Sequence, residues 1–124
     1  MSPHELGRRA ELAVADYLFV GGFELLARNL RLGPLEIDLV ARRGALVVMT
    51  EVRTRGATSF VGPFASVTRT KRLRLRAAAD RLWRERLARI PSIERVRVDV
   101  AAVTFRGKQT LVDYAEDALG LTVV

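Results

Sequence analysis

The sequence contains no cysteine, which excludes disulfide bonds, zinc–thiolate sites and thiol chemistry. It also has no apolar run that approaches the roughly 18 residues of a membrane-spanning helix, and its N-terminus lacks the apolar core of a signal peptide. We therefore expect a cytoplasmic protein with no membrane partner. Internal repeats and low-complexity segments are absent, and the single histidine, His4, receives no role.

Lysine and acidic residues are scarce relative to arginine. Only Lys71 and Lys108 are lysines among the 21 basic residues, and 14 acidic residues leave a net charge of +7. This excess favours an anionic partner, nucleic acid above others, and the plain alternative is a solvated basic surface. A bias toward arginine often reflects genome base composition rather than chemistry. The length of 124 residues predicts a single domain spanning residues 1–124.

The order of periodic segments predicts an α/β fold. Ser2 and Glu5 form a capping box at the start of a helix over residues 2–20, where Pro3 suits the first helical position, and a second helix is expected over residues 68–89. A helical crossover between the third and fourth strands makes their parallel pairing the expected choice. We expect a mixed sheet with helices on its faces. The predicted strands cover residues 23–30, 35–41, 46–53, 95–103 and 111–114, with a short helical turn at 116–119.

Residues 35–55 place carboxylates on two strands that are expected to form a hairpin. Glu36 and Asp38 share one face of the first strand, and Glu51 and Arg53 point the same way on the second. In such a hairpin Asp38 lies across from positions 49–51, and the turn length leaves the register open. Paired carboxylates are hard oxygen ligands that suit Mg²⁺ or Mn²⁺. A cation beside them would stabilise charge developing on a phosphate.

Several further residues are candidates for the same site. Glu11 lies at the edge of the buried stripe of the first helix, so it can reach the sheet margin. Lys71 shares the sheet-facing stripe of the second helix. The loop expected over residues 54–67 should overhang the cluster, where it can contact a substrate. The remaining candidates are basic residues that could bind phosphates or form an ordinary soluble surface, namely Arg55, Lys71, Arg72, Arg74 and Arg76.

Seven segments occur in the order found in a known family. They are LGRRAELAVADYL, ARNLR, LEIDLVA, TEVRTR, the Gly62-Pro63 loop, VTRTK and VRVDVAAV. Over about residues 5–104 the chain resembles the YraN-like family of bacterial proteins, which is assigned to the restriction-endonuclease-like fold and is similar to archaeal Holliday-junction resolvases.

This resemblance implies that the site is that of a nuclease. It places a helix acid at Glu11, the metal-binding aspartate at Asp38 and the second acid at Glu51, and it matches Lys71 to a lysine of the following helix. It also aligns Asp99, beside Arg97, with an aspartate of the family. The implied set of catalytic residues is Glu11, Asp38, Glu51, Arg53 and Lys71, with Asp38, Glu51 and Glu11 as metal ligands.

The chain departs from the family pattern at two positions. Leu35 stands where a glycine usually precedes Glu-Ile-Asp, and Arg53 stands where the family usually has a lysine. Arginine keeps the positive charge but cannot act as a general base, because its pKa exceeds about 12. If the lysine activates water in this fold, the chain is expected to be slow or inactive unless Lys71 replaces it.

Three functions therefore compete. The first is a metal-dependent endonuclease acting on DNA, in particular branched or otherwise structured DNA, with DNA favoured over RNA and a homodimer as one option for assembly. The second is a nucleic-acid-binding protein of the same fold that has lost catalysis, its acids surviving in ion pairs such as Glu51 with Arg53 or Arg55. The third is a small adaptor that binds protein.

Overall fold

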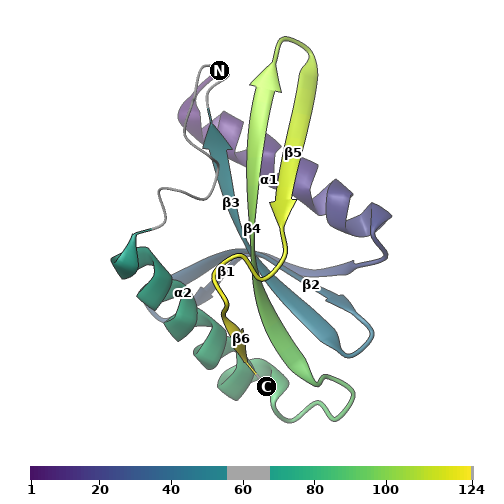
Figure 1. Cartoon of the computed structure of the whole chain (residues 1–124), viewed down its shortest axis with the longest axis vertical. Coiled ribbons are helices and arrows are strands. Elements are labelled where there is room, and N and C mark those ends of the chain that lie inside the picture. The colour runs from purple at the N-terminus through teal and green to yellow at the C-terminus, as the bar shows by residue number, and fades with distance from the viewer. Residues whose placement is uncertain (56–67, 124) are drawn as a thin grey trace.

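The structure is a computed structural model that describes residues 1–55 and 68–123. Two helices and a mixed sheet make up this part of the chain (Figure 1). The elements run in the order α1 (Pro3–Val20), β1 (Glu24–Leu32), β2 (Leu35–Arg43), β3 (Leu46–Arg55), α2 (Arg69–Leu82), a π-helical turn (Trp83–Leu87), β4 (Arg95–Arg106), β5 (Gln109–Ala115) and β6 (Thr122–Val123).

The sheet has the strand order β1-β2-β3-β4-β5, and β6 pairs with β4. Neighbouring strands are antiparallel except β3 and β4, which are parallel as the helical crossover predicted. The sheet is therefore mixed, and the predicted α/β class with helices on the faces is confirmed.

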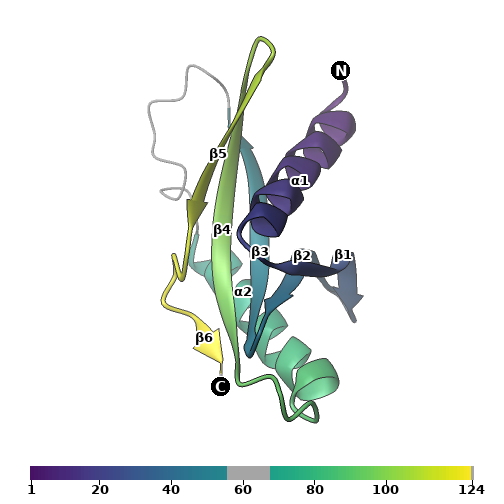
Figure 2. The ribbon, with the colours of Figure 1, turned by 90° about the vertical axis from the view of Figure 1, so that its right-hand side faces the viewer.

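Alternating residues of the central strands supply two separate hydrophobic clusters. Val47 and Met49 of β3 pack with α2, whereas Val48 packs with α1. Because successive side chains of a strand point to opposite faces, α1 and α2 must cover opposite sides of the sheet. Figure 2 shows the two helices placed in this way. The nearly continuous apolar run of β3 follows from burial on both sides.

Both helices begin with a side-chain cap, of which the one at Ser2 was predicted. The Ser2 hydroxyl accepts a hydrogen bond from the Glu5 amide at 3.2 Å, and the Thr68 hydroxyl accepts one from the Lys71 amide at 3.1 Å. Each cap satisfies an amide that has no partner inside the helix. The cap at Thr68 also places Lys71 in the first turn of α2, at the edge of the sheet.

Several predicted element ends differ from the structure, and the strands extend a few residues beyond most of the predicted ranges. The α-helix α2 ends at Leu82 and continues as the π-helical turn rather than to residue 89, and residues 116–119 form turns rather than a helix. The two-residue strand β6 was not predicted, because two residues are too few to show the alternating pattern of a strand. The strand β3 extends through Arg55, so residues 54 and 55 belong to it, and the rest of the expected loop lies outside the described residues.

The pairing of β2 with β3 ends at Leu39 and Thr50. Beyond this point β2 stays paired with β1, and β3 stays paired with β4. The sheet therefore divides at Asp38 and Glu51, and Figure 2 shows the β1–β2 hairpin turned away from β3, β4 and β5. This division positions the candidate site, because Asp38 and Glu51 lie just beyond the last residue pair of the β2–β3 ladder.

No helix within residues 1–55 and 68–123 is long and apolar enough to cross a membrane.

Candidate functional site

Asp38 lies where β2 and β3 separate. Its carboxylate accepts a hydrogen bond from the Val52 amide at 2.8 Å, so the side chain takes the place of the next rung of the ladder. The residue is half-buried. Burial raises the pKa of Asp38 to about 7, and the charges of Glu51, Glu11 and Glu36 act in the same direction, while the Val52 hydrogen bond opposes them.

Glu51 forms an ion pair with Lys71. The Lys71 ammonium lies 2.5 Å from the Glu51 carboxylate, which is 14% exposed. The pair joins β3 to the first turn of α2, as expected from the position of Lys71 on the sheet-facing side of that helix. Of the two arginines predicted as partners of Glu51, Arg55 bonds instead to Thr104 and Asp113, at 2.9 Å each.

Glu11 approaches Asp38 from the other side of the sheet. The Asn29 side-chain amide donates a hydrogen bond to Glu11 at 3.2 Å, and Asn29 belongs to β1. The β1–β2 register places Asn29 opposite Asp38, between the pairs Arg28 with Leu39 and Leu30 with Ile37. Glu11 therefore reaches the sheet margin, as its place at the edge of the helix stripe predicted, and its charge raises the pKa of Asp38.

A divalent ion would meet two of these carboxylates most readily. Within the described ranges 1–55 and 68–123, no group of three or more His, Cys or acidic side chains is close enough to hold one metal ion. Asp38 and Glu51 come together, and Glu11 acts on their charge from its contact with Asn29. Carboxylate oxygens are hard donors, and the charges of Glu51, Glu11 and Glu36 act on Asp38, so the donor set fits a hard metal ion.

A cavity of about 390 Å³ opens beside the two carboxylates. Its acidic lining comes from Glu36, Asp38 and Glu51, and its basic lining comes from Arg31, Lys71 and Arg74. Acids that can hold a cation thus lie next to cations that can hold a phosphate.

The predicted phosphate-binding arginines are distributed unevenly around this cavity. Arg74 lines it, and Arg72 is exposed on the same helix. Arg76 pairs with Asp80 at 3.6 Å on the surface of α2. Arg55 is bound to β4 and β5, as described above. Arg53 is half-buried on β3, two residues after Glu51.

Sequence reasoning missed two residues of this region, Asn29 and Arg31. Asn29 has a left-handed backbone with φ of 51°, which asparagine tolerates better than most residues. Arg31 pairs with the exposed Glu36 at 3.4 Å. The ARNLR segment contributed only to the family resemblance. The strand pattern around it predicted neither the hydrogen bond of Asn29 with Glu11 nor the ion pair of Arg31 with Glu36.

Asp99 is fully buried in a network of its own. Arg97 donates to both of its oxygens at 2.8 and 3.0 Å, the Tyr114 hydroxyl donates at 2.6 Å and the Asp117 amide at 2.9 Å. Hydrogen bonding to Asp99 raises the pKa of Arg97, and burial together with the Asp99 charge raises the pKa of Tyr114. Because Asp99 belongs to β4, its bonds to Tyr114 and Asp117 anchor β5 and the segment after it to β4.

The helix, three strands, helix and further strands define an α/β protein with a restriction-endonuclease-like core. Its acidic pair lies at the division of the sheet, beside a basic helix.

The family model described as "Uncharacterised protein family UPF0102" matches residues 10–103, and the chain belongs to this family. A UPF0102 protein of Sorangium cellulosum is 51% identical over 100 residues, covering 81% of this chain and 69% of the relative. UPF0102 proteins of Nitratidesulfovibrio vulgaris and Clavibacter michiganensis are 37% and 38% identical, covering 96% and 92% of this chain and 87% and 95% of theirs. The predicted membership of the YraN-like family is thereby confirmed.

Proposed function

We propose that the protein is a metal-dependent endonuclease that acts on DNA, with branched or otherwise structured DNA as its substrate. The observation that carries the proposal is the set of carboxylates at the parting of β2 and β3. Burial and three acidic side chains, Glu51, Glu11 and Glu36, raise the pKa of Asp38, and Lys71 forms an ion pair with Glu51.

Asp38 and Glu51 would hold Mg²⁺ or Mn²⁺, with Glu11 assisting from the α1 side. When bound, such an ion supplies Lewis-acid chemistry and lowers the pKa of a coordinated water. The chain's own basic residues then have separate tasks. Lys71 contacts Glu51, and Arg53 follows Glu51 by two residues on β3. Both cations can therefore hold the scissile phosphate and stabilise its developing charge.

Lys71 is the cation best placed to act in place of the lysine that the family usually has at the position of Arg53. Its ammonium contacts Glu51 directly and lines the cavity. The guanidinium of Arg53 stays charged and cannot accept a proton. We therefore assign to Lys71 the task of positioning a phosphate or a water beside the acidic pair.

Cleavage assays on branched and linear DNA with Mg²⁺ or Mn²⁺ test the proposal. We expect wild-type cleavage to be abolished by Asp38→Asn and by Lys71→Ala, and to be little changed by Arg53→Lys. Lys108→Ala is the matched control for Lys71, since Lys108 is the other lysine of the chain, is exposed and lies outside the cavity. Absence of metal-dependent cleavage across a broad panel of substrates would overturn the proposal.

A nucleic-acid-binding protein without catalysis is the second candidate, because the family's usual lysine is replaced by Arg53. It predicts DNA binding that weakens steeply with salt, since displaced counterions scale with the number of phosphate contacts. In that case Asp38→Asn leaves both DNA binding and its salt dependence intact, and neither the wild type nor any variant cleaves DNA.

A further inference from the structure

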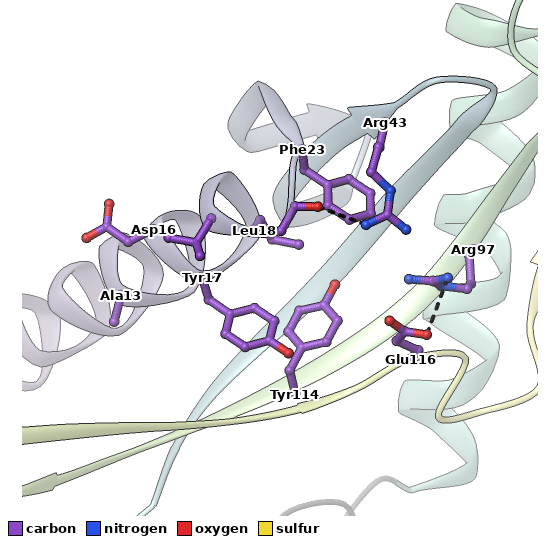
Figure 3. A pocket seen from close by; sticks show the side chains of 11 residues that line it. Ala13, Asp16, Tyr17, Leu18, Phe23, Arg43, Arg97, Tyr114 and Glu116 are labelled. Carbon is purple, nitrogen blue, oxygen red and sulfur yellow. Dashed lines mark hydrogen bonds and ion pairs between the residues drawn. The ribbon is translucent and has the colours of Figure 1, made fainter.

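A second cavity of about 530 Å³ lies on the α1 side of the sheet, apart from the acidic site. The C-terminal half of α1 forms one wall, and residues of β2, β4 and β5 approach it from the other side (Figure 3). Its volume falls in the range of small-molecule pockets, about 300–1,000 Å³. None of the residues assigned above to metal or phosphate lines it. The residues that matter for its chemistry are Asp16, Tyr17, Phe23, Arg43, Arg97, Tyr114 and Glu116.

Flat surfaces form much of its lining. The rings of Tyr17 and Tyr114 are stacked with centroids 5.0 Å apart and planes at 19°. Opposite them, the Arg43 guanidinium lies 4.4 Å from the centroid of the Phe23 ring. Figure 3 shows these two flat pairs facing the same space. Tyr17 is 48% exposed although it is a large aromatic residue, so its ring is available to a ligand. Such surfaces favour a planar aromatic ring.

Hydrogen-bonding groups of both kinds surround these rings. Arg43 donates from one nitrogen to the Gly21 carbonyl at 2.8 Å, and Arg97 uses two of its nitrogens on Asp99. The remaining Arg97 nitrogen lies 3.7 Å from Glu116, a distance that leaves its hydrogens available to a ligand. The exposed carboxylates of Asp16 and Glu116 supply acceptors.

The balance of charge disfavours phosphate as the anchoring group. Arg97 is paired with Asp99 and Glu116, and the lining contains two carboxylates, those of Asp16 and Glu116, beside its two guanidinium groups. A neutral ring that carries both donors and acceptors on its edge fits this lining better than an anion does. A phenyl ring from a protein partner would leave the polar groups without a hydrogen bond, which costs binding energy.

We propose that this cavity binds an unpaired nucleobase, and that guanine fits it best. Guanine offers the acceptors O6 and N7 to a guanidinium and the N2 amino group to a carboxylate, on a ring that stacks on aromatic side chains. The site is separate from the acidic pair, so base binding does not require cleavage. This inference goes beyond the nuclease proposal, because the cavity would recognise a base of the nucleic acid rather than its phosphate backbone.

Titration of the full chain with guanosine 5′-monophosphate, without divalent metal, tests the proposal by calorimetry and by NMR shifts. We expect saturable binding that inorganic phosphate does not displace. Tyr17→Ala should weaken it about fivefold or more, since loss of base–aromatic stacking has at least this effect, and Tyr17→Phe should keep it. Leu12→Ala is the matched control: Leu12 is on the same helix, is 46% exposed and lies outside the cavity.

Three results would overturn the assignment: no saturable binding by the wild type, displacement of the nucleotide by inorganic phosphate, or equal affinity in Tyr17→Ala. A chain that binds no nucleotide but self-associates through Tyr17 would assign this face to a second copy instead. Asp38→Asn should bind the nucleotide normally while losing cleavage, so failure of the nuclease proposal and failure of this one give different results.

Discussion

Asp38 owes its high proton affinity to its place at the parting of two strands. A carboxylate at an ordinary hairpin position would be solvated, whereas Asp38 is half-buried and faces three other acids. Its ordinary pKa of 3.8 rises to about 7, so the carboxyl group binds protons more strongly in the folded chain than in the unfolded chain. The group therefore contributes stability below the unfolded pKa, and this contribution is lost as pH rises through about 7.

The pH dependence of stability should reveal this group in metal-free protein. Between about pH 4 and pH 7 the free energy of unfolding of the wild type should fall relative to that of Asp38→Asn, because the unfolded state releases the proton first. Denaturant titrations at several pH values in the presence of a chelator measure the difference. Glu94→Gln, at an exposed carboxylate, should follow the wild type. A wild type that gains stability over Asp38→Asn as pH rises would contradict the assignment.

Residue types and spacing predicted part of this site. Asp38, Glu51 and Glu11 could be expected near one another, and Lys71 could be expected at the sheet edge. The sequence could not reveal that Glu51 pairs with Lys71 while Arg55 binds Asp113, because these choices depend on how the helix and strands pack. The role of Asn29 depends on its left-handed backbone, and the strand pattern carries no sign of that conformation.

At the scale of elements, the first turn of α2 connects the helix to the site. Thr68 caps the helix through the Lys71 amide, and the Lys71 side chain then reaches Glu51. The helix start was predictable because capping is local. The π-helical turn and β6 were not predictable, since they form only where the end of α2 and the last residues pack against β4 and its neighbours.

Removing the cap should weaken both the helix and its contact with β3. Thr68→Ala is expected to lower the free energy of unfolding by about 1 kcal/mol, because the Lys71 amide loses its acceptor. Thr70→Ala is the matched control, since Thr70 is exposed in the same turn and its hydroxyl does not cap the helix. Denaturant unfolding compares the two variants. Equal losses, or no loss in Thr68→Ala, would show that the cap contributes nothing to stability.

On the scale of the whole molecule, the divided sheet separates two kinds of surface. The acidic pair and the basic residues Arg31, Lys71 and Arg74 line the cavity beside α2, and the aromatic cavity lies on the α1 side. The α/β class, the β2–β3 hairpin and the parallel pair of β3 and β4 were predictable from periodicity and from the rules for crossover connections. The division of the sheet was not, because no local pattern marks where a hairpin leaves its neighbour.

Binding of Mn²⁺, followed by electron paramagnetic resonance, tests the central claim most directly because it needs no knowledge of the substrate. We predict one saturable ion per chain in the wild type, lost in Asp38→Asn and in Glu51→Gln and retained in Asp113→Asn, a carboxylate of β5 paired with Arg55. Equal binding by all four proteins, or no binding by the wild type, would contradict the claim that these two carboxylates form a metal site.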